Sequence, residues 1–321
     1  MKLGVLTVVL SDLSFADALA HLHSLGVQTV EVGSGGYPGK AHLDPDKLLG
    51  NDAAIEEIKA LLAKYNMTIC ALSCHGNAVH PDPVHAAKAN EDFEKTVLLA
   101  EKLGVETVVT FSGCPGDHPG AKYSNWVTCP WPDEFLTILD YQWNECLIPY
   151  WKKAAKFAND HGVKKIALEL HPGFCCYNPE TLLKLREAVG DTIGANFDPS
   201  HLFWQGIDPV AAIRKLQGAI YHFHAKDTKI DSINTAVNGV LDTKHYGDEL
   251  NRSWIFRTVG YGHDAATWKD IISALRVTGY DGAISIEHED SLMSSREGLA
   301  KAVKALQEVL IFEDKTAMFW A

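Results

Sequence analysis

The sequence has no long hydrophobic run, no basic run and no secretory leader pattern. No stretch of the 321 residues approaches the ~18 apolar residues that a membrane span needs. The apolar start MKLGVLTVVLSD is not followed by a small-residue cleavage site. Lys and Arg total 29 against 41 Asp and Glu, a formal charge of −12, which disfavours partners such as nucleic acid or an anionic membrane.

Paired cysteine motifs are also missing. The seven cysteines are odd in number and none forms a CxxC pair, which argues against a disulfide framework and against a zinc knuckle. A reducing compartment suits such a chain, so we expect a protein of the cytoplasm.

What the sequence does contain is a regular alternation of short β-type runs with amphipathic helical patterns. Eight such units in a chain somewhat over ~250 residues predict a (β/α)8 barrel, an α/β fold. A doubly wound sheet is the competing architecture, but the glycines of VGSGGYPG lack the GxGxxG spacing. The predicted strands are residues 2–10, 29–33, 68–74, 107–113, 164–170, 193–198, 218–225 and 282–289. The predicted helices are 15–26, with Gly26 suited to a C-terminal cap, 53–65, 91–104, 151–162, 179–190, 208–217, 266–279 and 295–310.

We therefore expect residues 1–321 to form one barrel domain with extended loops on its C-terminal face. Two segments lengthen this rim, at about 114–135 and 227–263, and the first is rich in aromatic residues. Such additions suit either a substrate larger than a simple sugar or a contact between subunits.

Polar side chains gather at the ends of the last four strands, where barrel enzymes carry their chemistry. Strand side chains alternate between the two faces, so each of these strands directs an acid or an imidazole into the lumen. Three carboxylates in one lumen cannot all stay ionised without a cation, and oxygen-rich ligands with one imidazole suit Mn²⁺ or Mg²⁺ better than a structural Zn²⁺, although Co²⁺ or Zn²⁺ could bind. The inward residues are Glu169, His171, Asn196, Asp198, His222, His224, Glu287 and Glu289.

The motifs LELHPG, NFDPSHLFWQG, YHFHAKD and YDGAISIEHED, in this order, resemble the xylose-isomerase-like superfamily of TIM-barrel sugar (phosphate) isomerases and epimerases. The similarity covers nearly the whole chain. It implies one divalent metal, with Mn²⁺ expected, on Glu169, Asp198, His224 and Glu287. It also implies that Glu169 and Glu287 are the acid/base pair, which moves a proton next to a sugar carbonyl through an enediolate.

Further residues are candidates for substrate contact. His201 resembles a substrate-side histidine of the family, and Arg257 stands where relatives often place a substrate-contacting arginine, with a salt bridge as the alternative. His75 either touches substrate or caps a loop, and Lys226 extends the inward row of its strand. His222, one layer below His224, either supports that ligand or touches substrate. Glu31 could bond sugar hydroxyls or pair with a barrel lysine.

The expected function is a metal-dependent sugar isomerase or epimerase with a small carbohydrate substrate. The alternative is a lyase acting on 3-oxo-glycosides, similar to the α subunits of C-glycoside deglycosidases, in which the same metal site drives elimination. We expect a homo-oligomer, or a hetero-subunit if the chain is deglycosidase-like. A related metal-dependent endonuclease is disfavoured by the acidic charge, and a non-catalytic partner role is disfavoured by the intact ligand quartet.

Overall fold

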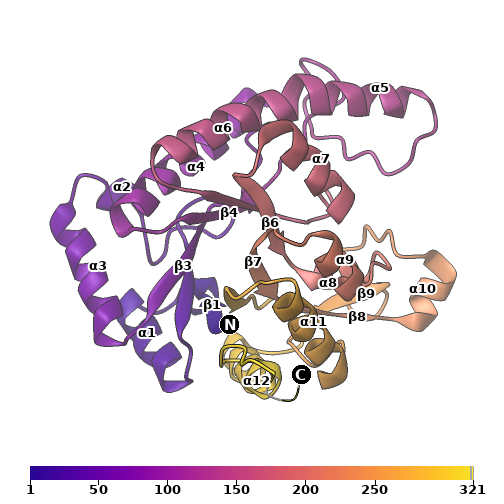
Figure 1. Ribbon diagram of the computed structural model, residues 1–321. Coiled ribbons are helices and arrows are strands. Elements are labelled where there is room, and N and C mark those ends of the chain that lie inside the picture. The colour runs from indigo at the N-terminus through magenta and orange to yellow at the C-terminus, as the bar shows by residue number, and fades with distance from the viewer. Residues whose placement is uncertain (319, 321) are drawn as a thin grey trace.

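Eight parallel strands close into a barrel within residues 1–318 and 320, the part of the chain that this computed structural model describes (Figure 1). Their order is β1-β10-β7-β6-β5-β4-β3-β2, and pairing of β1 with β10 closes the ring. The predicted (β/α)8 fold is thereby confirmed. The barrel strands are β1 (Lys2–Leu6), β2 (Thr29–Gly33), β3 (Thr68–Ser73), β4 (Thr107–Phe111), β5 (Lys165–Glu169), β6 (Ile193–Phe197), β7 (Ile220–Ala225) and β10 (Ala283–Ile286).

Helices alternate with these strands and form the outer layer of the molecule (Figure 1). In the described residues none of them is both long and apolar enough to cross a membrane. The longer helices are α1 (Phe15–Ser24), α3 (Asp52–Lys64), α4 (Pro83–Leu103), α6 (Ile148–Asp160), α7 (Pro179–Val189), α11 (Ala265–Val277) and α12 (Ser295–Val309). The shorter ones are α2 (Pro45–Leu48), α5 (Glu134–Tyr141), α8 (Pro199–Phe203), α9 (Pro209–Lys215), α10 (Ser232–Asn238), the 3-10 helix η1 (Thr7–Leu10) and the π-helix η2 (Gln142–Leu147).

Capping residues set where several helices begin and end. Ser14 Oγ accepts the backbone N–H of Asp17 at the start of α1, at 3.1 Å. The Asn178 side chain accepts the N–H of Thr181 in a capping box on α7. Gly26, just past α1, has a φ of +82°, the left-handed conformation expected of a C-terminal cap.

Most predicted bounds differ from the observed ones by up to three residues, and two elements differ by more. The first strand was predicted to run to Leu10, but it ends at Leu6, the last residue of β1 that pairs with β2, and residues 7–10 turn into η1. Helix α4 begins at Pro83 rather than at residue 91, with Asp82 as its N-cap. In both cases the boundary depends on strand pairing or capping, which hydrophobic periodicity does not report.

The rim segment 227–263 contains a small antiparallel sheet of β8 (Asp227–Ile230) and β9 (Trp254–Arg257), joined through α10. The buried carboxylate of Asp227 ties this segment to the barrel. It accepts the backbone N–H groups of Gly260, Gly262 and His263 at 3.0–3.1 Å and His263 Nδ1 at 2.7 Å. Trp268 Nε1 on α11 also donates to it, at 3.3 Å.

The barrel interior is apolar toward its N-terminal end. Ala71, Val109 and Ala167 point into the lumen from three adjacent strands and pack against Tyr221. A Cβ on Gly194 would lie 2.3 Å from the Tyr221 ring, so only glycine leaves room for this ring. The polar side chains nearer the C-terminal ends of the strands line a cavity instead.

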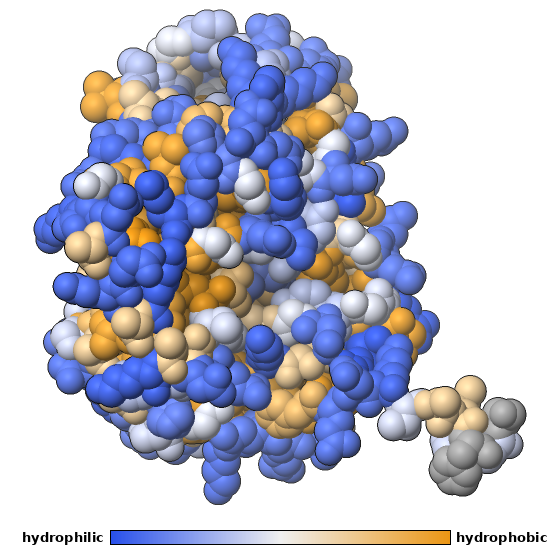
Figure 2. All heavy atoms as spheres, turned by 60° about the vertical axis from the view of Figure 1, so that its left-hand side comes forward, coloured by the Kyte–Doolittle hydropathy of each residue, from blue (hydrophilic) through white to orange (hydrophobic). Residues whose placement is uncertain are grey.

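The outer surface is mainly hydrophilic in the view of Figure 2, where hydrophobic residues form separate patches between polar ones. Residues 311–318 are exposed, and this end of the chain projects from the body of the molecule (Figure 2).

Candidate functional site

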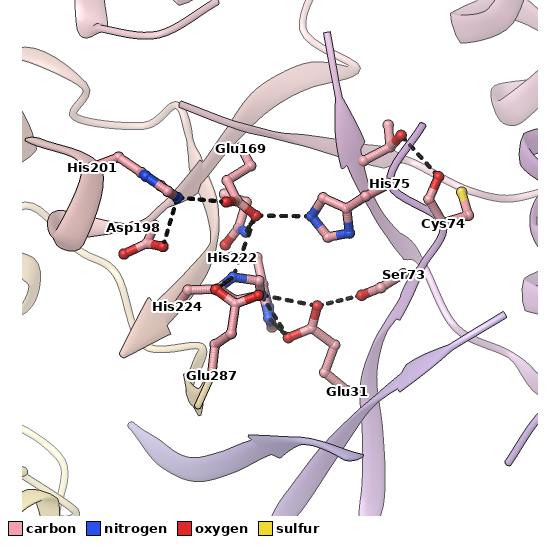
Figure 3. Close-up of polar contacts among 12 residues, drawn as sticks. Glu31, Ser73, Cys74, His75, Glu169, Asp198, His201, His222, His224 and Glu287 are labelled. Atoms are coloured by element: carbon pink, nitrogen blue, oxygen red, sulfur yellow. Dashed lines mark hydrogen bonds and ion pairs between the residues drawn. The ribbon is translucent and has the colours of Figure 1, made fainter. Parts of the chain in front are cut away.

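The four residues predicted as metal ligands converge at the C-terminal end of the barrel (Figure 3). Glu169 ends β5, Asp198 follows β6, His224 lies in β7 and Glu287 follows β10. One potential ligand atom from each lies within 4.8 Å of those of the other three. The cluster is therefore compact enough for all four side chains to surround a single ion.

Two buried atoms of this cluster, Asp198 Oδ2 and His224 Nδ1, make no hydrogen bond among the described residues. The nearest cation to Asp198 Oδ2 is the Lys226 ammonium at 3.1 Å, and His224 Nδ1 faces Glu287 Oε2 at 3.2 Å and Glu169 Oε2 at 3.5 Å. Three carboxylates that converge in this way are costly without positive charge between them. The residues present therefore fit a divalent metal ion.

Glu169 is held between two imidazoles. Its Oε2 is 2.8 Å from His75 Nε2, and its Oε1 is 3.0 Å from His201 Nε2. Burial raises the pKa of the Glu169 carboxyl, but the hydrogen bonds from His201 and His75 outweigh burial and hold it well below its usual value. Burial, with His171 and Lys226 nearby, lowers the pKa of His201 to about 3. Glu169 is therefore ionised near neutral pH, which is the state that a proton acceptor requires.

Lys226 extends into the same cluster from the end of β7. Its Nζ lies 2.6 Å from Glu287 Oε2, 2.8 Å from Glu289 Oε2 and 3.1 Å from Asp198 Oδ2. Burial raises the pKa of Asp198 to about 7, and Lys226 only partly opposes this shift. Burial also acts on Glu287, but Lys226 and His224 bring its pKa down to about 2.

Glu31 lies beneath the cluster and has partners that the sequence did not indicate. In the described residues it pairs with no lysine. Its carboxylate accepts from His222, His224 and Ser73 (Figure 3), and from Ser285. His222, predicted to support His224 or touch substrate, lies 2.8 Å from Glu31 Oε2 and is buried. The supporting role is the one that this geometry favours.

Arg257 lies in β9, and its guanidinium forms an ion pair with Asp290. Its Nε donates to Asp290 Oδ2 at 3.0 Å, and the same oxygen accepts the backbone N–H of Thr258 at 2.8 Å. Of the two roles weighed for Arg257, the structure shows the salt bridge.

Three adjoining cavities open above the cluster. One of about 150 Å³ is lined by His75, Glu169, Lys226 and Glu287, among others. It shares Tyr37, Phe111, His171 and Glu289 with a cavity of about 480 Å³. A third, of about 340 Å³, is lined by His201 and shares His171 and Tyr246 with the second. Together they could hold a molecule larger than a free sugar.

The aromatic lining of these cavities was not predicted residue by residue. Phe111 stands two positions after the inward Val109, so strand alternation could have identified it. His171 was expected in the lumen and lines all three cavities. Phe256 and Tyr246 come from the rim segment 227–263, and no local pattern places their rings against the barrel mouth.

Comparison with known proteins agrees with this architecture. The family model described as "Xylose isomerase-like TIM barrel" matches residues 19–309. The chain belongs to the xylose isomerase-like TIM barrel family. It is 44% identical over 313 residues to the "Uncharacterized protein YfiH" of Bacillus subtilis (strain 168), covering 97% of this chain and 99% of that protein. It is also 25% identical to an inosose dehydratase of Mesomycoplasma hyopneumoniae (strain J), over 87% of this chain and 82% of the relative.

Solved structures of the same fold are more distant in sequence. A structure of the IOLI protein with a zinc atom aligns with a TM-score of 0.67 at 18% identity and covers 97% of this chain and 98% of that one. A D-tagatose 3-epimerase-like protein aligns with a TM-score of 0.63 at 21% identity, over 96% and 98%. An inosose dehydratase and an epimerase-like protein are thus both found among the proteins that this chain resembles.

Proposed function

We propose that this chain is a metal-dependent isomerase or epimerase of polyhydroxy ketones, which moves a proton at the carbon next to the carbonyl. The observation that carries this proposal is the convergence of Glu169, Asp198, His224 and Glu287 around one point, with two of the facing atoms buried and without a hydrogen bond among the described residues. These four residues would hold the ion, for which three carboxylates and one imidazole favour Mn²⁺. When bound, a divalent ion supplies Lewis-acid stabilisation of the negative charge that develops on the sugar oxygens.

Glu169 and Glu287 are the proposed acid and base of the reaction. Glu169 ends β5 and Glu287 follows β10, and β6 and β7 stand between these strands in the barrel, so the carboxylates reach the cavity from different sides. Both have lowered pKa values and are ionised near neutral pH. One takes the proton from carbon. The other first takes up a proton, from a substrate hydroxyl or from water, and then returns it to the opposite face of that carbon, which inverts the centre.

Neighbouring side chains orient these groups and the substrate. His75 and His201 hold the Glu169 carboxylate by one oxygen each, which fixes its direction. Lys226 and His171 line the cavity over the cluster and can donate to substrate oxygens. His75, His201 and Lys226 are therefore proposed to position the base and the sugar.

The test is hydrogen–deuterium exchange next to the carbonyl. The protein is loaded with Mn²⁺ in D₂O and incubated with free ketoses and ketose phosphates, and exchange is followed by NMR. Glu169→Gln and Glu287→Gln should each lower exchange by about 10²–10⁴-fold. Glu101→Gln is the matched control, because Glu101 also pairs with an imidazole, His161 Nδ1 at 2.9 Å, but on the outer face. Wild-type exchange in both active-site variants would refute the assigned roles.

A second candidate is elimination, because the first step is the same. A 3-oxo-glycoside or an inosose that loses the proton can expel a group from the neighbouring carbon instead of regaining the proton. The adjoining cavities of about 480 and 340 Å³ favour a substrate larger than a free ketose. The inosose dehydratase relatives support this class of reaction as well. Incubation with an inosose and with a 3-oxo-glycoside separates the candidates, since elimination yields an unsaturated ketone that absorbs in the ultraviolet.

A further inference from the structure

Glu31 is a carboxylate enclosed in the barrel, one layer below the proposed metal ligands (Figure 3). It comes from β2, on the opposite side of the ring from β6, and its exposed fraction is 0%. His222 Nε2 lies 2.8 Å from Oε2, and His224 Nε2 lies 2.9 Å from Oε2 and 3.0 Å from Oε1. Ser285 Oγ donates to Oε2 at 2.8 Å, and Ser73 Oγ donates to Oε1.

The contact with Glu31 determines which nitrogen of His224 carries the hydrogen. A carboxylate only accepts hydrogen bonds, so the Nε2 that faces it must be protonated. Burial lowers the pKa of His224, but Glu31 and Glu287 outweigh burial and hold it well above its usual value, so both nitrogens can carry hydrogen in the metal-free chain. The neutral imidazole that binds an ion has one N–H, so its Nδ1 is then a lone pair. That Nδ1 is the buried atom without a hydrogen-bond partner in the described chain, and it faces Glu287 and Glu169.

We propose that Glu31 is a positioning residue for the metal site, which holds His224 as the Nε2–H tautomer and directs Nδ1 at the ion. Glu31 acts through His224 and has no place among the four ligands. The inference rests on the proposed function in one respect, namely that the ion binds at His224. Carboxylates that hold a ligand imidazole in this way typically change metal affinity by 10–100-fold when they are removed.

The other donors keep Glu31 itself in place. They come from β3, β7 and β10, so strands on three parts of the ring converge on one carboxylate. A rotation of the His224 ring that exchanged its nitrogens would place an unprotonated nitrogen against this carboxylate. The same rotation would remove the lone pair from the cluster, so the arrangement selects one ring orientation.

Glu31, His222 and His224 could also hold a metal by themselves, since their ligand atoms lie within 4.8 Å of one another. The contacts of 2.8–3.0 Å between them are those of hydrogen bonds with the protons in place. His224 would in addition have to bind an ion through each nitrogen. A second ion at this position is therefore an outcome of the experiment that would overturn the proposal.

The experiment has two parts, and the first needs no variant of Glu31. Imidazole ¹⁵N NMR of the metal-free wild-type protein, taken to a pH at which the His224 ring is neutral and with the signal assigned by its loss in His224→Asn, gives the tautomer of His224. We expect hydrogen on Nε2 and none on Nδ1. Hydrogen on Nδ1 would overturn the proposal, whether or not any variant of Glu31 folds.

The second part measures metal affinity directly. Mn²⁺ binding to wild type, Glu31→Gln and Glu101→Gln is titrated by the EPR signal of the free ion, with no substrate present. We expect one ion per chain in wild type, a Kd about 10–100-fold higher in Glu31→Gln, and an unchanged Kd in Glu101→Gln. Equal Kd values for wild type and Glu31→Gln, or two ions per wild-type chain, would overturn the inference. If wild type binds no ion, the proposed function fails, and the tautomer of His224 still decides whether Glu31 orients that ring.

Discussion

Replacing Lys226 with methionine tests whether its ammonium group takes the place of a divalent ion while the chain is metal-free. Lys226 is 2% exposed, and its Nζ lies 2.6 Å from Glu287 Oε2 and 3.1 Å from Asp198 Oδ2. Methionine keeps the apolar length of the side chain and removes the charge. The contact with Glu289 is discounted, because that side chain is 48% exposed and solvent screens the pair.

The expected loss of stability follows from the burial of the pair. Removing one partner of a buried ion pair costs about 3–5 kcal/mol. Without the Lys226 ammonium, Asp198 can take up a proton and avoid an unpaired buried charge. We therefore expect the free energy of unfolding to fall by about 3 kcal/mol near neutral pH, the lower end of that range. Unfolding entropy of about 2.1 cal/mol/K per residue gives roughly 0.7 kcal/mol/K for this chain, so the Tm of the metal-free variant should fall by about 4–5 °C.

Mn²⁺ should remove most of this difference, because the ion supplies the positive charge that the variant lacks. The assay is thermal unfolding by near-ultraviolet circular dichroism at pH 7.5, first after chelation and then with excess Mn²⁺. Lys156→Met is the control, since its pair with Asp160 at 2.6 Å is exposed and should contribute little. A fall in Tm of the same size with and without Mn²⁺ would refute the idea that Lys226 and the ion serve the same carboxylates.

Two further predictions follow from the site and the rim. The pKa of Asp198 is raised to about 7, mainly by burial, so in the metal-free chain this ligand is protonated below that pH and must release its proton when an ion binds. The plot of log Kd for Mn²⁺ against pH should therefore be steeper below pH 7 than above it, by about one log unit per pH unit. The same slope on both sides of pH 7 would contradict this. Asp227→Asn should destabilise the chain by about 2–3 kcal/mol, because its carboxylate accepts the N–H groups of Gly260, Gly262 and His263. Limited proteolysis should then cut the rim segment 231–252 faster, and unchanged cleavage would show that other contacts hold this segment.

Much of the fold could be predicted because most helices and strands depend on residues close together in the sequence. Each strand–helix unit has its own hydrophobic period, and caps such as Gly26 depend on residues a few positions away. The end of β1 could not be predicted, because Leu6 is the last residue of that strand to pair with β2 and the apolar run continues beyond it. The hairpin of β8 and β9 was also missed, since its two strands are separated by the whole of α10 and a polar loop.

Part of the candidate site could likewise be predicted from local patterns, and part could not. Alternation along a strand was enough to predict that Glu169, Asp198, His224 and Glu287 point into the lumen, because a side chain's face depends only on its own strand. The partners of Glu31 depend on how the ring closes: His222 is 191 residues away and Ser285 is 254 residues away along the chain. No local pattern indicates contacts between residues so far apart in the sequence. The tertiary structure alone therefore decides which side chains support the ligands from below and which aromatic residues line the cavities above them.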